Sequence, residues 1–119
     1  MSYRHLCVAL LPLIFAGCAS TDPEPVEQIR LTEQAISQAK SLGVSPDDST
    51  NLRQAEEKFS LAQAAVTEGA FKEARTYAEQ AELDARLAEA EHLTAKSKQQ
   101  LTELRNGITR LRKQLGGLQ

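Results

Sequence analysis

The chain has 119 residues, which is room for one modest domain. Hydrophobic residues make up 41% of it, but only 4% of the residues are aromatic and none is Trp, which argues against a thick globular core. The net charge is −2, and both cysteines lie within the first eighteen positions. A disulfide framework or a zinc site in the folded part is therefore not expected.

The first eighteen residues have the three parts of a secretory leader. Arg4 supplies a positive charge, ten almost wholly apolar residues follow at 6–15, and two small residues precede Cys18. The apolar run is about half as long as a membrane-spanning helix requires. A cysteine after Phe-Ala-Gly resembles the lipobox of bacterial lipoproteins, although Phe15 stands where that family usually has Leu. The resemblance implies cleavage after residue 17, a diacylglycerol on the Cys18 sulfur and an N-acyl chain on its amino group, with no other cofactor.

Several acyl chains hold a protein firmly on a bilayer, at roughly 0.8 kcal/mol per buried methylene. The alternative is an ordinary cleaved signal peptide with an incidental cysteine. Ala19 follows the cysteine where Gram-negative lipoproteins retained on the inner membrane carry Asp, so the resemblance implies the periplasmic face of the outer membrane. Residues 18–25 then form a lipidated tether, because Pro23 and Pro25 favour an extended backbone.

The first helix is expected over residues 25–42, where apolar residues recur near one face. Gly43 follows the last apolar position and suits a left-handed C-terminal cap, after which Val44 can fold back onto the last turn. Ser45-Pro46 is predicted to start the second helix, because Ser caps free N–H groups and Pro suits the first helical position.

The second helix repeats apolar residues at spacings of three and four up to a turn at Glu68-Gly69-Ala70. In the third helix, which begins near Phe71, five alanines repeat at spacings of four and three. We term these the alanine seam: Ala74, Ala78, Ala81, Ala85 and Ala88. Because small residues let two helices approach closely, an antiparallel hairpin of these two helices is predicted, with the first helix packed across it. Phe59, Phe71 and Tyr77 are expected to fill the interior.

A second repeat, the leucine seam, continues along the third helix. It consists of Leu83, Leu87, Ala90, Thr94, Ser97, Leu101, Leu104, Ile108, Leu111 and Leu115. Asn106-Gly107 is a turn signal within it, but the repeat keeps its phase there, so we expect an unbroken helix of about 67 Å that ends at Gly116-Gly117. The distal part has no partner left in the chain, which predicts another copy, a different coiled coil or a membrane surface as its partner. The predicted interaction residues are Leu101, Leu104, Ile108, Leu111 and Leu115.

Charge is distributed unevenly along the chain. Residues 19–91 carry fifteen acids and seven bases, a net charge of −8, whereas residues 92–119 carry six bases and one acid, a net charge of +5. The six bases are Lys96, Lys98, Arg105, Arg110, Arg112 and Lys113. This basic end predicts binding to anionic lipid or a cell-wall polymer, and the alternative is a solvated helix face.

Catalytic and metal-binding patterns are missing from the sequence. His92 is the one histidine outside the leader, and it shares the phase of the alanine seam, where a packing role is expected. We find no phosphate loop, metal-spaced cysteine pair or nucleophile elbow, so no catalytic residue and no metal ligand is predicted, and we expect no enzyme activity. Nucleic acid is not an expected partner, since the leader directs export and no aromatic residue follows Tyr77.

Two segments carry a family resemblance. Gly69-x-Phe71-x-x-Ala74 and the block Asp-Ala-Arg-Leu-Ala-Glu-Ala at 84–90 are similar to the DUF4398 family, over about residues 26–93. That family occurs in bacterial envelope lipoproteins and has no assigned activity. The resemblance implies a helical hairpin and a place in the cell envelope, and it supplies no mechanism.

The combined prediction is an all-α protein with an antiparallel helical hairpin in a three-helix unit and a long, coiled-coil-like C-terminal helix. Its expected parts are a signal peptide (1–17), a lipidated tether (18–25), a hairpin domain (26–93) and a basic helical extension (94–119). The expected function is that of an outer-membrane lipoprotein with a structural or protein-interaction role in the periplasm. The alternatives are a module that binds anionic lipid or cell-wall polymer, and an accessory adaptor subunit of an envelope complex.

Overall fold

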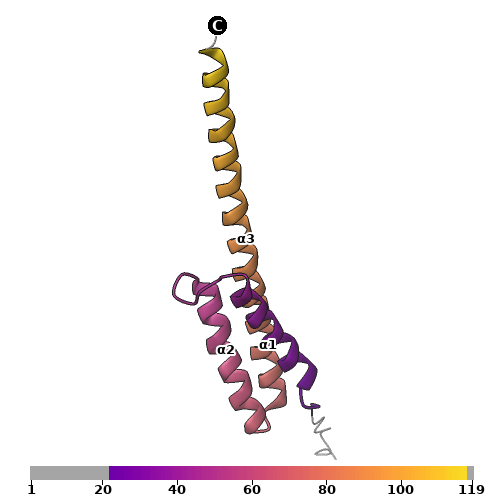
Figure 1. Cartoon of the computed structure of the whole chain (residues 1–119). Coiled ribbons are helices and arrows are strands. Elements are labelled where there is room, and N and C mark those ends of the chain that lie inside the picture. Colours follow the sequence, from indigo (N-terminus) through magenta and orange to yellow (C-terminus); the bar gives the residue numbers. More distant parts are fainter. Residues whose placement is uncertain (1–21, 118–119) are drawn as a thin grey trace, which may run out of the picture.

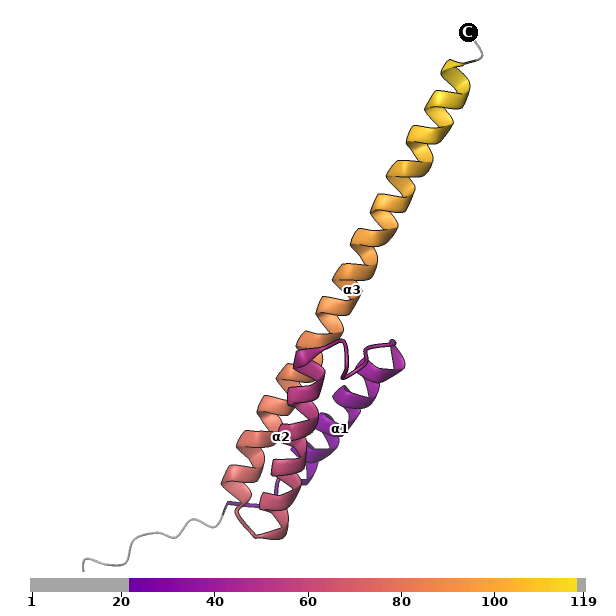
Figure 2. The same cartoon turned by 90° about the vertical axis from the view of Figure 1, so that its left-hand side faces the viewer.

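The computed structural model describes residues 22–117, which form three helices. These are α1 (Val26–Ser41), α2 (Thr50–Thr67) and α3 (Phe71–Gly116). Both α1 and α2 lie along the first half of α3, and the second half continues beyond them with no neighbour among the described residues (Figures 1 and 2). The predicted all-α fold, with its three-helix unit and long C-terminal helix, is confirmed. The 46 residues of α3 give it a length of about 69 Å, unbroken at Asn106-Gly107 as predicted.

Glycines in the left-handed region end the first two helices. Gly43 has φ +95° and Gly69 has φ +74°, a region that L side chains rarely adopt. After α1, the Val44 N–H donates to the Ala39 carbonyl over 3.2 Å, and after α2 the Ala70 N–H donates to the Ala65 carbonyl over 2.9 Å. These are the long bonds of a Schellman cap, and the first of them folds the buried Val44 back onto α1, as predicted.

The predicted start of the second helix at Ser45-Pro46 was wrong. Helix α2 begins four residues later, at Thr50, where the Ser49 hydroxyl oxygen accepts a hydrogen bond from the Leu52 N–H over 3.2 Å. Ser45 serves a separate turn, because its hydroxyl oxygen accepts from the Asp47 N–H over 3.2 Å. Serine hydroxyls stabilise turns and helix starts by the same type of bond, so the residue type alone did not distinguish the two.

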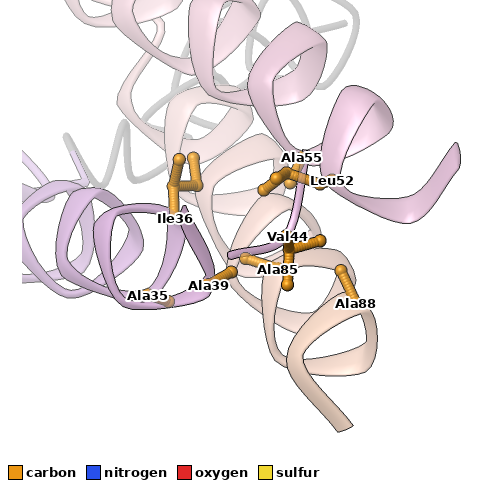
Figure 3. Close-up of a cluster of buried hydrophobic side chains, with 8 residues drawn as sticks. All are labelled: Ala35, Ile36, Ala39, Val44, Leu52, Ala55, Ala85 and Ala88. Atoms are coloured by element: carbon orange, nitrogen blue, oxygen red, sulfur yellow. The ribbon is translucent and has the colours of Figure 1, made fainter. Parts of the chain in front are cut away.

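Small side chains make up the core. All five members of the alanine seam are at most 1% exposed, and Leu52 and Thr32 are the largest side chains that are fully buried among the described residues. Figure 3 shows that residues of all three helices contribute to one buried cluster, including Ala39 of α1, Leu52 of α2, and Ala85 and Ala88 of α3.

The expectation that three aromatic residues fill this interior was wrong. Phe59, Phe71 and Tyr77 are only half-buried. Phe59 packs against the outside of the central cluster. The reason is steric, since an alanine seam brings the helix backbones too close together for an aromatic ring to fit between them.

Polar contacts between distant residues fix the rotation of the helices. The Thr32 hydroxyl lies 2.9 Å from the Ala78 carbonyl oxygen and 2.8 Å from that of Gln28, so α1 is tied to α3 inside the core. The Gln28 amide donates to Glu82 over 2.7 Å nearby. These contacts hold the alanine seam inward, and the opposite side of α3 therefore faces outward.

Candidate interaction surface

The two seams lie on opposite sides of α3. An α-helix turns by 100° per residue, which places the leucine seam about half a turn away from the alanine seam. The large members of the leucine seam are between 43 and 68% exposed. They are Leu83, Leu87, Leu101, Leu104, Ile108, Leu111 and Leu115. One face of α3 thus carries an apolar stripe that no described part of the chain covers.

The stripe is longer than the interaction residues predicted from the sequence. All five of those residues are exposed, but so are Leu83 and Leu87, which lie where α1 and α2 flank α3. We confined the prediction to the distal part because the proximal part had partners within the chain. Those partners cover only the alanine seam. The phase of Leu83 and Leu87 in the leucine seam was the signal that could have identified them.

The six predicted basic residues are all exposed, but they do not form one face. Helical geometry places Lys98, Arg105 and Arg112 directly beside the leucine seam. It places the other three on the far side of the helix, near the phase of the alanine seam. These are Lys96, Arg110 and Lys113.

A single row of charged residues borders the leucine seam. Its members are seven residues apart and change sign along the helix, and we term them the charged row: Asp84, Glu91, Lys98, Arg105 and Arg112. The two acids lie beside α2, where Asp84 accepts from the Lys58 ammonium over 2.5 Å and Glu91 accepts from the Asn51 amide over 2.8 Å. The bases lie on the unaccompanied part of α3. The opposite border of the leucine seam is mostly uncharged. It begins with Arg86 and continues with Leu93, Gln100, Gly107 and Gln114.

Other polar groups in the three-helix unit have structural partners. Hydrogen bonds from Gln28 and Arg86 lower the pKa of Glu82, and the bond from Gln28 joins α1 to α3. His92 is half-buried in a shallow hollow beside Ala88 and Val44. Between residues 22 and 117, no three His, Cys, Asp or Glu side chains are grouped so that they could hold a metal ion.

The predicted membrane anchor lies outside the described part of the chain, since Cys18 and the leader precede residue 22. Within residues 22–117, no helix combines the length and the apolar character needed to cross a bilayer.

Comparison with known proteins places the chain in a family. Residues 27–104 match the family described as "Domain of unknown function (DUF4398)". The crystal structure of a DUF4398 family protein (PA2901) from Pseudomonas aeruginosa PAO1 is similar, with 56% sequence identity and a TM-score of 0.78 over 82% of this chain and 100% of that chain. No curated protein matches this sequence. Because the family match spans more than half of the chain and the similar structure shares its fold, this protein belongs to the DUF4398 family.

Proposed function

We propose that this protein is an outer-membrane lipoprotein that presents the leucine seam of α3 to a protein partner in the periplasm. The observation that carries the proposal is the exposure of seven large aliphatic side chains on one face of a continuous helix. Covering a half-exposed leucine is worth about 1 kcal/mol. A partner that covers the whole seam therefore gains several kcal/mol, which is enough to support specific binding.

The membrane anchor in this proposal is the lipid on Cys18. It is supported by the leader-like pattern before Cys18 and by the two prolines that follow it. The three-helix unit begins at Val26, eight residues after Cys18, so only a short segment separates the anchor from the folded part. In this arrangement the lipid holds the protein at the membrane, and α3 binds the partner.

Cell fractionation tests the anchor. A Cys18→Ser variant is expected to leave the membrane fraction, because it has no thiol to which a diacylglycerol can be attached. Cys7→Ser is the matched control, since Cys7 lies in the leader and should not affect the distribution. If the Cys18→Ser variant stays in the same membrane with unchanged gel mobility, the proposed anchor is wrong.

Photo-crosslinking in intact cells tests the interaction surface. A photoreactive amino acid at Leu104, in the leucine seam, is expected to form crosslinked products. The matched control is Gln99, which is also exposed but lies about half a turn away on the same helix. Equal yields of products from the two positions would show that the seam has no special role, and would contradict the proposal.

The basic end of α3 favours a second candidate function, which is binding to anionic lipid or a cell-wall polymer. Its support is the net charge of +5 on residues 92–119 and the exposure of all six bases. Salt-sensitive co-sedimentation with anionic vesicles or cell-wall material is the test. Reversal of the six charges should abolish sedimentation if they bind the surface, and unchanged sedimentation rules this function out.

A further inference from the structure

We infer that a second copy of this chain covers the leucine seam, with the two α3 helices antiparallel and Leu83 of each copy facing Leu115 of the other. The inference rests on the proposed function and names the partner. It uses the whole seam, including the part beside the three-helix unit, where Leu83 and Leu87 remain exposed. The contact would be a two-stranded coiled coil that relates the copies by a two-fold axis near residue 99.

Side-chain size favours the antiparallel arrangement. The middle of the leucine seam consists of the small residues Ala90, Thr94 and Ser97, and the distal part consists of leucines and an isoleucine. Antiparallel pairing places each small residue opposite a large one from the other copy. The resulting layers are Leu83 with Leu115, Leu87 with Leu111, Ala90 with Ile108, Thr94 with Leu104, and Ser97 with Leu101. Every layer then contains at least one large aliphatic side chain, so the core of the coiled coil is filled along its length.

The charged row gives a second, independent reason. In an antiparallel coiled coil, this row faces the same row of the other copy in the reverse order. Asp84 then meets Arg112 of the second copy and Glu91 meets Arg105 of the second copy, and symmetry forms each pair twice. Lys98 meets Lys98 of the second copy at the two-fold axis, and this pair of like charges is the one unfavourable contact of the charged row. The carboxylate of Asp84 accepts from Lys58 through one oxygen and keeps capacity for a further donor.

A parallel arrangement would neither fill the core of the coiled coil nor bring opposite charges together. In register, it would stack Ala90, Thr94 and Ser97 on themselves in three successive layers and leave a poorly filled segment. It would also bring the two basic ends, each with a net charge of +5, side by side. The antiparallel arrangement instead lays the basic end of each copy against the acidic part of the other.

Disulfide crosslinking measures the orientation. Two differently tagged full-length chains, one with Leu83→Cys and one with Leu115→Cys, are co-expressed in a Cys7→Ser background and oxidised mildly in intact cells. We expect a linked species that carries both tags. Neither variant alone should form a linked dimer, because antiparallel pairing separates the two copies of position 83 by about 48 Å. The background chain and a Gln99→Cys variant, whose cysteine points away from the seam, are the controls.

A charge exchange measures the pairing of the charged row. Glu91→Lys alone and Arg105→Glu alone each place like charges opposite each other, and each should lower the yield of the linked species several-fold. The double variant restores opposite charges and should restore the yield. Both positions are exposed, so the single changes should leave the three-helix unit folded. Failure of the double variant to recover would overturn the proposed pairing.

The remaining outcomes separate this inference from the proposed function. Linked dimers from Leu83→Cys alone would show a parallel dimer and overturn the antiparallel arrangement. Photo-crosslinks from Leu104 to a different protein, with no self-product, would overturn the inference and leave the proposed function standing. The absence of any product from Leu104 would overturn both.

Discussion

Replacing Leu52 by Ala removes the largest apolar side chain that is fully buried in the three-helix unit. The truncation deletes three carbons, which are worth about 0.8 kcal/mol each in transfer free energy, and leaves a cavity. Most members of the buried cluster that contains Leu52 are alanines, so few flexible side chains can move into the space. We therefore expect a loss of about 3 kcal/mol in the free energy of unfolding. That is more than half of the total for a unit with about 5 kcal/mol of stability.

Urea unfolding of Leu52→Ala, followed by circular dichroism, measures this loss. The matched control is Leu61→Ala on the same helix. Its side chain is 49% exposed, so its removal should cost less than about 1 kcal/mol and leave no enclosed cavity. Similar losses for the two variants would refute the reasoning, because they would mean that Leu52 does not lie in a closed core.

Further substitutions test the packing of the helices, the cap of α2, the distal part of α3 and the contacts of Glu82. Ala85→Leu forces extra carbons into the alanine seam and should cost about 2 kcal/mol in urea titration, whereas Ala64→Leu at an exposed position of α2 should cost less than about 0.5 kcal/mol. Gly69→Ala places a Cβ at φ +74° and should lower the melting temperature, with a cost of about 1–2 kcal/mol. Gly107→Ala meets no atom within 4 Å and should stabilise distal α3 by about 1 kcal/mol, which slower amide exchange around this residue would show. Hydrogen bonds from an amide and a guanidinium hold the pKa of Glu82 below its ordinary value of 4.5, so its stabilisation is complete above about pH 4.5 and disappears as the pH falls through the lowered pKa. Glu82→Gln should therefore flatten the acid limb of the stability profile.

Periodicity predicted the packing of α3 down to single residues. A four–three repeat of Ala74, Ala78, Ala81, Ala85 and Ala88 needs only local helical geometry to place all five side chains on one face, and that face is the buried one. Helix ends at Gly43 and Gly69 were also predictable, since a left-handed cap strongly favours glycine. The start of α2 was not, because Ser45 and Ser49 carry the same local signal, and one stabilises a turn while the other caps the helix.

The contacts that orient the helices could not be predicted from the sequence. The Thr32 hydroxyl meets the Ala78 carbonyl 46 residues away, and the Lys58 ammonium meets Asp84 26 residues away. Whether such groups meet depends on the rotation of each helix about its own axis, which no local pattern encodes. The candidate surface was more predictable. The phase of Leu83 and Leu87 placed them in the leucine seam, on the side of α3 opposite the alanine seam that α1 and α2 cover, but we confined the prediction to the distal residues.

The two seams of α3 differ in side-chain size rather than in periodicity. The small side chains of one suit contacts within the chain, and the large side chains of the other suit the contact between chains that we propose. Both seams repeat at spacings of four and three, so periodicity assigns each of them to a packed interface. The alanine seam ends at Ala88, close to where α1 ends and α2 begins, and its small side chains suit close approach of helices held together by short turns. The leucine seam runs about 40 Å beyond that point. A partner that is not covalently linked has to offset the entropy of association with buried area, and leucine supplies more of that area than alanine.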